Sequence, residues 1–497
     1  MILLLSFESK GYRLETKKKY HKFRGISYLE RVSGMSDVLV YFDPDVDGVF
    51  SGFFVVRWLM SMGISYSWYI NTNREHGWTL DPKRVRGKNI IAVDFIMEAE
   101  LVKSLVEDYG CNVINMDHHE NGDEFIEYDN GKNFGVVINN QYAFEEADSR
   151  YLSGGGVVFE SICGVCKEFD TVLHRSIVGI TLLSDIRDIE NPLARMYLKE
   201  LYNAKCTGYI KYLIDNTIGD IDYGFGVPRM DRNYVDYKFS PALNSCFRFN
   251  KEDMVVEFVL GSGYIDLNYH KMQKELVKQI QEKIKIINYP KLRVCYFKEK
   301  DIDGYDDVLS SFVGLVASQY LDGVHSCICY MISYDTDGKP YVKRASFRGN
   351  INGLEYRKGI TEIIHGVGHG SAFGIKELYP TKQLFYRANE ICAEVEEDSA
   401  YMKDVTRVAN LAMFVNRHGK EYGEYNMYCL SQNRRLVKYI GRRIVKKQLS
   451  ANYHEFDVDG VIVKCFDKNI NFDNGLILPI NERGNLCMYL EENVQEV

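Results

Sequence analysis

Short β-branched runs that stop at acidic or histidine residues constrain this chain more than any other feature of its sequence. They recur from residue 36 to about 190 and are separated by helix-like stretches, which is the alternation that a mostly parallel sheet requires. The runs are DVLVYF (37–42), NIIAVDF (89–95) and CNVINMD (111–117). In open α/β sheets, ligands bind outside the carboxyl ends of the strands. The pattern therefore predicts an α/β fold whose polar strand ends form a site.

The first polar strand end is the run DPDVDG, which places Asp43, Asp45 and Asp47 at alternate positions. Three carboxylates this close repel one another unless a cation neutralises them, so the run predicts a metal site. A calcium-binding EF-hand loop begins in the same way, but it needs a glutamate six residues after the glycine, where this chain has Phe54. A solvated acidic turn remains the alternative.

The other two strand ends carry Asp94 and the triplet Asp117-His118-His119, and the apolar run SIVGITLLS is followed by Asp185. Carboxylate together with imidazole suits Mn²⁺, Zn²⁺ or Fe²⁺, whereas Mg²⁺ prefers oxygen ligands alone. For the two histidines, the alternative is a pair of hydrogen-bonded core imidazoles. Aspartate or histidine at four element ends of one α/β unit predicts a two-metal hydrolase.

Charge and cysteine usage exclude several classes of protein. The chain has 61 Lys and Arg against 69 Asp and Glu, a net charge of −8, so any site for a polyanion must be local. The 12 cysteines are scattered in a chain without a recognisable secretory signal, which predicts reduced thiols. No apolar window is long enough to span a membrane. We therefore predict a cytoplasmic protein with no membrane contact.

The most basic window is RRLVKYIGRRIVKK (434–447), with seven cations in fourteen positions. A helix here would gather cations on one face, and that face would bind the backbone of a polyanion. The residues on this face would be Arg435, Lys438, Arg442 and Lys446. A solvated helix face is the alternative, because many charge runs bind nothing.

Taken in order, the segments DPDVDG, AVD, MDHHE and LLSD resemble the motifs of the DHH phosphoesterase superfamily. Four further segments are similar to the RecJ-like single-strand exonucleases within it, namely NREHGWTL, LSGGGVVF, FSPALNSCFR and FVGLVASQY. RASFRGN and GVGHGSAFG look like the S-x-R and G-G-H elements of the family's DHH-associated C-terminal domain. The resemblance covers about residues 36–377.

The chain departs from the family pattern at three positions. Val367 replaces the first glycine of G-G-H, and Phe247 replaces a glycine in FSPALNSCFR. Tyr41, four residues before Asp45, stands where many relatives carry a histidine ligand. Asp43 is then the expected substitute for that ligand.

The resemblance implies two divalent cations as cofactors, with Mn²⁺ favoured and Mg²⁺ as the alternative. Asp94 would lie between them and contribute to both. The implied ligands are Asp45 and Asp94 for one cation, and Asp47, Asp94, His118 and Asp185 for the other.

Further roles also follow from the resemblance. His119 would face the scissile phosphate, and Asp117 would orient a ligand histidine. The implied substrate-binding residues are Arg74, Arg248, Ser346, Arg348 and His369. Small residues around the last three would let backbone N–H groups approach a phosphate.

The implied domain organisation has five parts. They are an N-terminal extension (1–35), a DHH catalytic domain (36–258), a connecting helix (259–290), a DHH-associated substrate-binding domain (291–378) and a further C-terminal domain (379–497) with nucleic-acid binding as one role.

The expected function is a metal-dependent exonuclease that degrades single-stranded DNA, 5′ to 3′, to nucleotide 5′-phosphates, in DNA repair and recombination. Single-stranded DNA is the expected partner, together with single-strand-binding or replication proteins. A second enzyme reading is a phosphodiesterase for nanoRNA or cyclic dinucleotides. A third reading, from another class, is a catalytically weak replication scaffold, whose signature would be the loss of motif carboxylates that this chain retains.

Overall fold

The computed structural model describes most of the chain between residues 23 and 397 and a set of strands beyond it. The described residues are 23–72, 74–119, 125–142, 151–185, 192–203, 208–218, 230, 234–322, 324–350, 355–397, 406–408, 437–440, 443–450, 453–458, 461–465, 474–482 and 485–493. Two compact units divide the chain: Met1–Arg187 with Glu200–Asp398, and Asp188–Lys199 with Ser399–Val497. No described helix is long and apolar enough to cross a membrane.

The first sheet carries the motif-bearing strands. Its members are β1 (Val38–Phe42), β2 (Tyr66–Ile70), β3 (Asn89–Val93), β4 (Asn112–Asp117), β5 (Glu127–Asp129) and β6 (Phe134–Asn139). They lie in the order β2-β1-β3-β4-β6-β5, and all neighbours are parallel except β5 and β6. Interior strands of a parallel sheet are buried on both faces, which explains their continuous apolar runs. The predicted α/β fold with a parallel sheet is confirmed.

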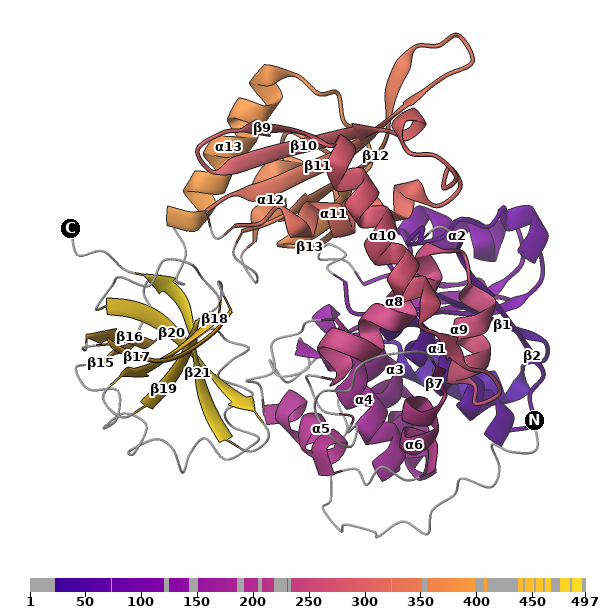
Figure 1. The fold of residues 1–497 in the computed structure, drawn as a ribbon. Helices are drawn as coiled ribbons and strands as arrows, with labels where there is room; N and C mark the ends of the chain where they lie inside the picture. Colours follow the sequence, from indigo (N-terminus) through magenta and orange to yellow (C-terminus); the bar gives the residue numbers. More distant parts are fainter. Residues whose placement is uncertain are drawn as a thin grey trace. The chain divides into compact units, whose positions relative to one another are not determined.

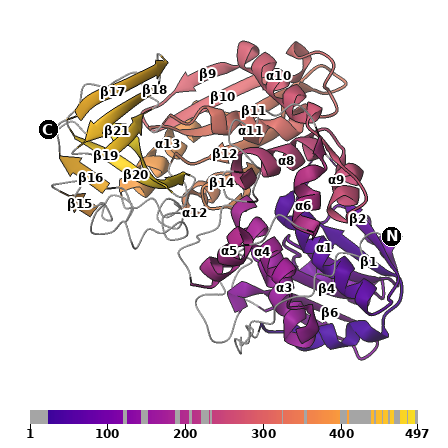
Figure 2. The ribbon, with the colours of Figure 1, turned by 60° about the horizontal axis from the view of Figure 1, so that its bottom comes forward.

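Helices cover both faces of this sheet (Figure 2). Alternate residues of β1 point to opposite faces. Phe42 lies against α1 so closely that a Cβ on Gly52 would come within 2.6 Å of its ring. Tyr41 points to the other face and shares a buried cluster with Val102 and Leu105 of α2. The helices of this part are α1 (Val46–Ser61), α2 (Ala99–Glu107), α3 (Gly154–Val165), α4 (Val172–Ser184), α5 (Pro192–Asn203), α6 (Gly208–Asp215), α8 (Ser240–Arg248) and α9 (Glu252–Val259).

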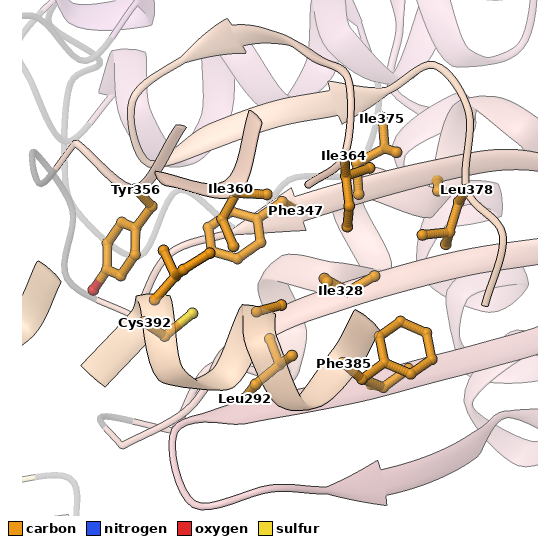
Figure 3. Close-up of a cluster of buried hydrophobic side chains, with 14 of the residues drawn as sticks. Leu292, Ile328, Phe347, Tyr356, Ile360, Ile364, Ile375, Leu378, Phe385 and Cys392 are labelled. Atoms are coloured by element: carbon orange, nitrogen blue, oxygen red, sulfur yellow. The ribbon is translucent and has the colours of Figure 1, made fainter. Parts of the chain in front are cut away.

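A second six-stranded sheet follows in the order β13-β14-β12-β11-β10-β9. Its strands are β9 (Lys285–Asn288), β10 (Leu292–Lys298), β11 (Ser326–Tyr334), β12 (Pro340–Arg348), β13 (Gly366–His369) and β14 (Ala372–Ile375). Its helices are α10 (Asn268–Lys283), α11 (Val313–Gln319), α12 (Tyr356–Thr361) and α13 (Lys382–Glu397). The side chains of α10 and α11 pack on one face, and those of α12 and α13 pack on the other. In Figure 3, Phe385 and Cys392 of α13 point toward Ile328 and Phe347 of the sheet.

Two sequence expectations about this second domain need revision. The connecting helix was expected at 259–290, but α10 begins at Asn268 and ends at Lys283, and β9 pairs antiparallel with β10. Two β-branched isoleucines favour an extended backbone, and pairing with β10 supplies the backbone hydrogen bonds that a longer helix would otherwise make. The predicted boundary at residue 378 would detach α13, yet α13 belongs to the second domain's core and this compact unit extends to Asp398.

The C-terminal unit contains a seven-stranded sheet in the order β15-β16-β20-β21-β19-β18-β17, shown in yellow tones in Figure 1. Its strands are β15 (Thr406–Val408), β16 (Val437–Ile440), β17 (Arg443–Ser450), β18 (Tyr453–Val458), β19 (Val461–Cys465), β20 (Asn474–Glu482) and β21 (Asn485–Asn493). The helix expected at 434–447 is therefore wrong, because β16 and β17 occupy most of this window. Valine, isoleucine and tyrosine alternate there with cations and favour strands. Arg435 and Arg442 lie outside the described residues.

Candidate metal centre and anion site

The predicted acidic residues meet at one edge of the first sheet. Phe42 of β1 pairs with Val93 of β3, which pairs with Met116 of β4, so the three strands end level with one another. The residues that come next are Asp43, Asp94 and Asp117. Because parallel strands end at the same edge, the sheet brings together carboxylates that lie far apart in the sequence.

Asp94 turns sharply out of its strand. Its φ is 66°, in the left-handed region that aspartate tolerates better than most residues, while its backbone N–H still donates to the carbonyl of Met116 at 2.9 Å. Its Oδ1 is buried and accepts no hydrogen bond from the described residues. Gly154 closes over this atom, since a Cβ there would lie 2.2 Å from Asp94 Oδ1. A glycine is thus required for the carboxylate to keep its place.

Asp45 and Asp47 are fixed by helix N-termini. Asp45 caps α1, and its Oδ1 accepts a hydrogen bond from the Gly48 N–H at 2.9 Å. Asp47 accepts hydrogen bonds from the first two N–H groups of α3, those of Gly154 at 2.7 Å and Gly155 at 2.9 Å. Helix N-termini favour negative charge, so the backbone holds both carboxylates in orientation.

His118 lies at the centre of the cluster and is buried. Its Nε2 is 3.1 Å from Asp94 Oδ1 and 3.9 Å from Asp47 Oδ2, and its Nδ1 is 3.7 Å from Asp185 Oδ2. Asp185 follows the last residue of α4. One atom from each of Asp47, His118 and Asp185 falls within a 4.8 Å group, the arrangement expected of ligands to one ion. The structure therefore brings together the residues predicted for this cation.

A second group lies beside it. Atoms of Asp43, Asp45 and His76 fall within 4.8 Å of one another, and His76 Nδ1 contacts Asp43 Oδ2. Asp43 is buried, whereas the side chain of His76 is 43% exposed. His76 comes from the loop after β2, and the sequence reasoning did not single it out.

Like charges make this edge electrostatically costly without a counter-ion. Burial, followed by the charge of Asp43, raises the pKa of Asp45. Burial raises the pKa of Asp94 well above its usual range, and the charges of Asp47 and Asp45 raise it further. Burial and the charge of Asp185 act in the same way on the pKa of Asp47. Divalent cations relieve both penalties, because they replace lost water and neutralise the repulsion.

The donor set fits divalent cations. It consists of five carboxylates and two imidazoles, namely Asp43, Asp45, Asp47, Asp94, Asp185, His76 and His118. The buried Asp94 Oδ1, without a hydrogen bond among the described residues, has the acceptor capacity that an ion would use. Mixed oxygen and nitrogen donors are typical of transition-metal sites.

His119 has a different partner arrangement. Asp117 Oδ1 lies 2.7 Å from His119 Nδ1, so Asp117 orients His119, whereas the sequence had paired Asp117 with a ligand histidine. Burial by itself would lower the pKa of His119, but the charge of Asp117 and its hydrogen bond outweigh burial and raise the pKa to about 9. Asp117 therefore favours the protonated form of this imidazole.

Arginines gather near the carboxylate edge. Arg74, whose φ is 52°, donates from Nη1 to Asn244 Oδ1 at 3.1 Å. Arg248 of α8 donates from Nη1 to Gln273 Oε1 at 2.8 Å, and its Nε is buried without a hydrogen-bond partner among the described residues. Burial, followed by the charges of Arg74 and Arg348, lowers the pKa of Arg248 well below its usual range.

The second domain adds Ser346 and Arg348, which point to the same face of β12 because they are two positions apart. Arg348 Nη1 lies 2.7 Å from Ser346 Oγ, and Gly314 leaves room for the guanidinium, since a Cβ there would lie 2.5 Å from Nη2. Burial, followed by the charge of Arg74, lowers the pKa of Arg348 to about 10. Arg344, two residues before Ser346, also affects the pKa of Arg74.

The arginine cluster is defined here as Arg74, Arg248, Arg344 and Arg348. Within the part of the chain that the structure describes, none of the four makes an ion pair with a carboxylate, and the hydrogen-bond partners of the first, second and fourth are neutral groups. These arginines are half-buried, and their like charges repel one another unless an anion neutralises them. The cluster therefore has the character of an anion site.

Sequence reasoning missed several members of the site. Arg344 and Asn244 lie within the segments RASFRGN and FSPALNSCFR that carried the resemblance, and Gly154 begins the triplet in LSGGGVVF, so a local signal was present for each. His76 had only its place beside Gly77 in NREHGWTL. The predicted His369 lies in β13, but its side chain is outside what the structure describes.

Comparison with known proteins shows what the chain is similar to. Residues 37–184 match the N-terminal domain of the DHH family. Over 416 residues, the chain is 24% identical to the single-stranded-DNA-specific exonuclease RecJ of Bacillus subtilis. The match covers 77% of this chain and 49% of that protein, so the chain spans about half the length of this curated relative. The resemblance read from the motifs is confirmed.

Solved structures show the same fold. RecJ of Thermus thermophilus in complex with Mn²⁺ superposes with a TM-score of 0.63 at 15% identity, covering 96% of this chain and 73% of that one. The Mg²⁺ complex of the same protein gives a TM-score of 0.59 at 12% identity, covering 96% and 71%. An exonuclease RecJ bound to manganese gives 0.51 at 15% identity, covering 76% and 98%.

Proposed function

We propose, from the premise that this chain is a RecJ-like protein of the DHH superfamily, that it is a divalent-metal-dependent exonuclease hydrolysing single-stranded DNA to nucleotide 5′-phosphates. The 5′ to 3′ direction is part of the proposal and comes from the resemblance. Two observations in relatives support it: the curated relative is a single-stranded-DNA-specific exonuclease, and solved RecJ structures hold Mn²⁺ or Mg²⁺.

The single observation that carries the proposal is that a cluster of negative charges, the carboxylates at the sheet edge, lies near a cluster of positive charges, the arginine cluster. The carboxylates at the sheet edge need cations, and the arginine cluster needs an anion. The charges of Asp45 and Asp43 act on Arg74, so the two clusters are electrostatic neighbours. A phosphodiester satisfies both, because its oxygens bind cations on one side and guanidinium groups on the other.

The chain's own residues supply orientation and a proton. The N-terminus of α3 fixes Asp47, and the left-handed turn at Asp94 aims its carboxylate toward His118. Two divalent cations, when bound, supply a nucleophilic water at neutral pH and neutralise charge on the phosphate. Asp117 bonds Nδ1 and favours the protonated imidazole, in which form His119 would offer Nε2–H to a phosphate or leaving oxygen.

The arginine cluster acts on binding more than on chemistry. A guanidinium can donate two parallel hydrogen bonds to a phosphate. Arg348 and Arg248 are half-buried and held by neutral partners, so less conformational freedom remains to be lost on binding. The role of the C-terminal unit in nucleic-acid binding remains a prediction.

The discriminating experiment compares four substrates with Mn²⁺ and with EDTA: a labelled single-stranded DNA, a duplex, an RNA dinucleotide and a cyclic dinucleotide. We expect mononucleotide release from the single strand alone, and from its 5′ end. Preference for either dinucleotide would favour the nanoRNA or cyclic-dinucleotide reading. Absence of hydrolysis on all four, with intact DNA binding, would favour the replication-scaffold reading.

Asp94→Ala tests the metal assignment. Because Asp94 interacts with both groups of ligands, its loss should lower the hydrolysis rate by more than about 100-fold, the upper range for losing a residue that merely orients a ligand. DNA binding should largely survive, because the arginine cluster is untouched. A folded Asp94→Ala protein that keeps more than a few per cent of the rate at saturating Mn²⁺ would contradict the assignment.

A further inference from the structure

Tyr41 stands at a position where a histidine ligand was expected, but its hydroxyl is bound by the segment that follows β2. Its hydroxyl donates to Asn71 Oδ1 at 2.6 Å and accepts from the Thr79 N–H at 3.0 Å. Its ring stacks on Trp78 with 4.8 Å between centroids. Tyr41 is fully buried by these contacts, so it does not contribute a metal ligand.

The same contacts build the loop that carries His76. Asn71 Nδ2 donates to the carbonyls of Glu75 and Gly77, both at 2.7 Å, and these residues flank His76 on either side. Gly77 has a φ of 91°, a left-handed turn that glycine adopts without strain. The loop therefore presents the imidazole in a fixed direction.

That direction is toward the carboxylates. His76 Nδ1 contacts Asp43 Oδ2, and the three-residue group with Asp45 fits within 4.8 Å. The Gly77 N–H also approaches Asp43 Oδ1 at 3.4 Å. Asp43 is thus held between the loop and the end of β1, with Asp45 beside it at the start of α1.

We propose that His76 is a ligand of the cation held by Asp43 and Asp45, taking the place of the imidazole that Tyr41 does not provide. This inference rests on the proposed metal-dependent function and deepens it. It predicts that both cation positions contain an imidazole, His118 at one and His76 at the other. Such a site prefers Mn²⁺ over Mg²⁺, because Mg²⁺ favours oxygen ligands alone.

The alternative is that His76 only pairs with Asp43 and touches no metal. The two cases differ in whether the His76 imidazole is a ligand of the bound ion. The test therefore observes bound Mn²⁺ directly by electron paramagnetic resonance. Titration of the wild-type chain should give two bound Mn²⁺ ions. His76→Ala should weaken one of them by more than about tenfold, since even losing a residue that orients a ligand costs that much.

Pulsed measurements of ¹⁴N coupling identify the ligand itself. With both positions filled, the wild-type chain should show nitrogen coupling from two imidazoles, and His76→Ala should lose one contribution. His76→Asp should restore the second ion without its nitrogen coupling, and Mg²⁺ should displace that ion more readily than in wild type. His325→Ala is the matched control, because His325 pairs with Asp322 in the second domain and belongs to no metal group among the described residues.

The outcomes separate this inference from the proposed function. If the wild-type chain binds no Mn²⁺, the metal-dependent function itself fails. If it binds two ions and His76→Ala changes neither affinity nor nitrogen coupling, His76 is not a ligand while the proposed function stands. Circular dichroism of His76→Ala and His76→Asp checks that both variants are folded.

Discussion

The carboxylate edge of the first domain is largely buried and the arginine cluster beside it is half-buried. Both gather like charges, yet they are stabilised differently. The carboxylates are held by charged or strongly polar groups, namely helix N-termini and imidazoles. Three of the arginines, Arg74, Arg248 and Arg348, donate hydrogen bonds to neutral amide, hydroxyl and carbonyl groups. The first arrangement fixes geometry for ions, and the second leaves positive charge for a substrate to neutralise.

This difference assigns catalysis to the carboxylates and substrate binding to the arginines. Ligands of a metal centre must be placed accurately, because catalysis depends on how the ions share the reacting oxygens. Residues that bind a phosphate must keep their charge and remain close enough to donate to it. Small movements of these side chains change substrate affinity more than the rate of hydrolysis. Variants of the two clusters should therefore fail in different ways.

Gly154→Ala should disturb the carboxylate edge and give the largest effect of the variants described below. Its Cβ would lie 2.2 Å from Asp94 Oδ1, so either the carboxylate or the start of α3 must move. Because Gly154 also donates to Asp47, two metal ligands lose their positions together. We expect kcat to fall by more than about 100-fold, with Mn²⁺ binding weakened in parallel. Steady-state kinetics and Mn²⁺ titration measure the two effects.

Gly34→Ala is the control for that variant, because a Cβ at Gly34 meets nothing within 4 Å. It should leave both kcat and Mn²⁺ affinity unchanged. Wild-type kinetics in Gly154→Ala would show that α3 does not constrain Asp94.

Arg348→Ala should affect capture instead. A charge-assisted hydrogen bond contributes about 1.5 to 3 kcal/mol, so KM for single-stranded DNA should rise roughly 10- to 100-fold while kcat falls less. Inorganic phosphate should raise the melting temperature of the wild-type chain but not of Arg348→Ala, whereas Mn²⁺ should raise both.

Arg31→Ala controls for the loss of a guanidinium, because Arg31 pairs with Asp129 on the surface. It should leave KM unchanged. A fall in kcat alone for Arg348→Ala would assign Arg348 to transition-state stabilisation and would remove the contrast between the two clusters.

A buried titratable group in an apolar setting gives the smallest expected effect and sharpens the comparison. His174 of α4 packs against the rings of Phe53, Phe54 and Phe169, and its Nδ1 lies 2.6 Å from the Phe169 carbonyl. Burial lowers its pKa to about 4, whereas the imidazole of an unfolded chain has a pKa of about 6.5.

Between these values the unfolded state binds the extra proton, so the free energy of unfolding falls as the pH falls, by up to roughly 3 kcal/mol. Urea denaturation at pH 7.5 and pH 5, with EDTA present, measures the loss. In His174→Gln the difference between the two pH values should be smaller. Equal pH dependence in the two proteins would mean that His174 is protonated in the folded state.

Sequence and structure contributed unequally to the second domain and the C-terminal unit. The sequence predicted a connecting helix at 259–290, and only the pairing of β9 with β10 showed that the helix stops at Lys283. The basic window at 434–447 has residues at helical spacing, yet it lies mostly in β16 and β17. Both errors arose where β-branched residues could satisfy either period, so long-range strand pairing decided the outcome.

The sequence by itself determined the resemblance to the DHH superfamily, the α/β class and the set of acidic residues at the strand ends, because each motif is local and parallel strands necessarily end at one edge. Only the tertiary structure decided which imidazole meets Asp43, which carboxylate Gly154 encloses and which amide holds Arg74. These contacts join residues far apart in the sequence: 33 positions separate His76 from Asp43, 60 separate Gly154 from Asp94, and 170 separate Asn244 from Arg74. No local pattern encodes a contact of that kind, because it depends on how loops and helices pack around the completed sheet.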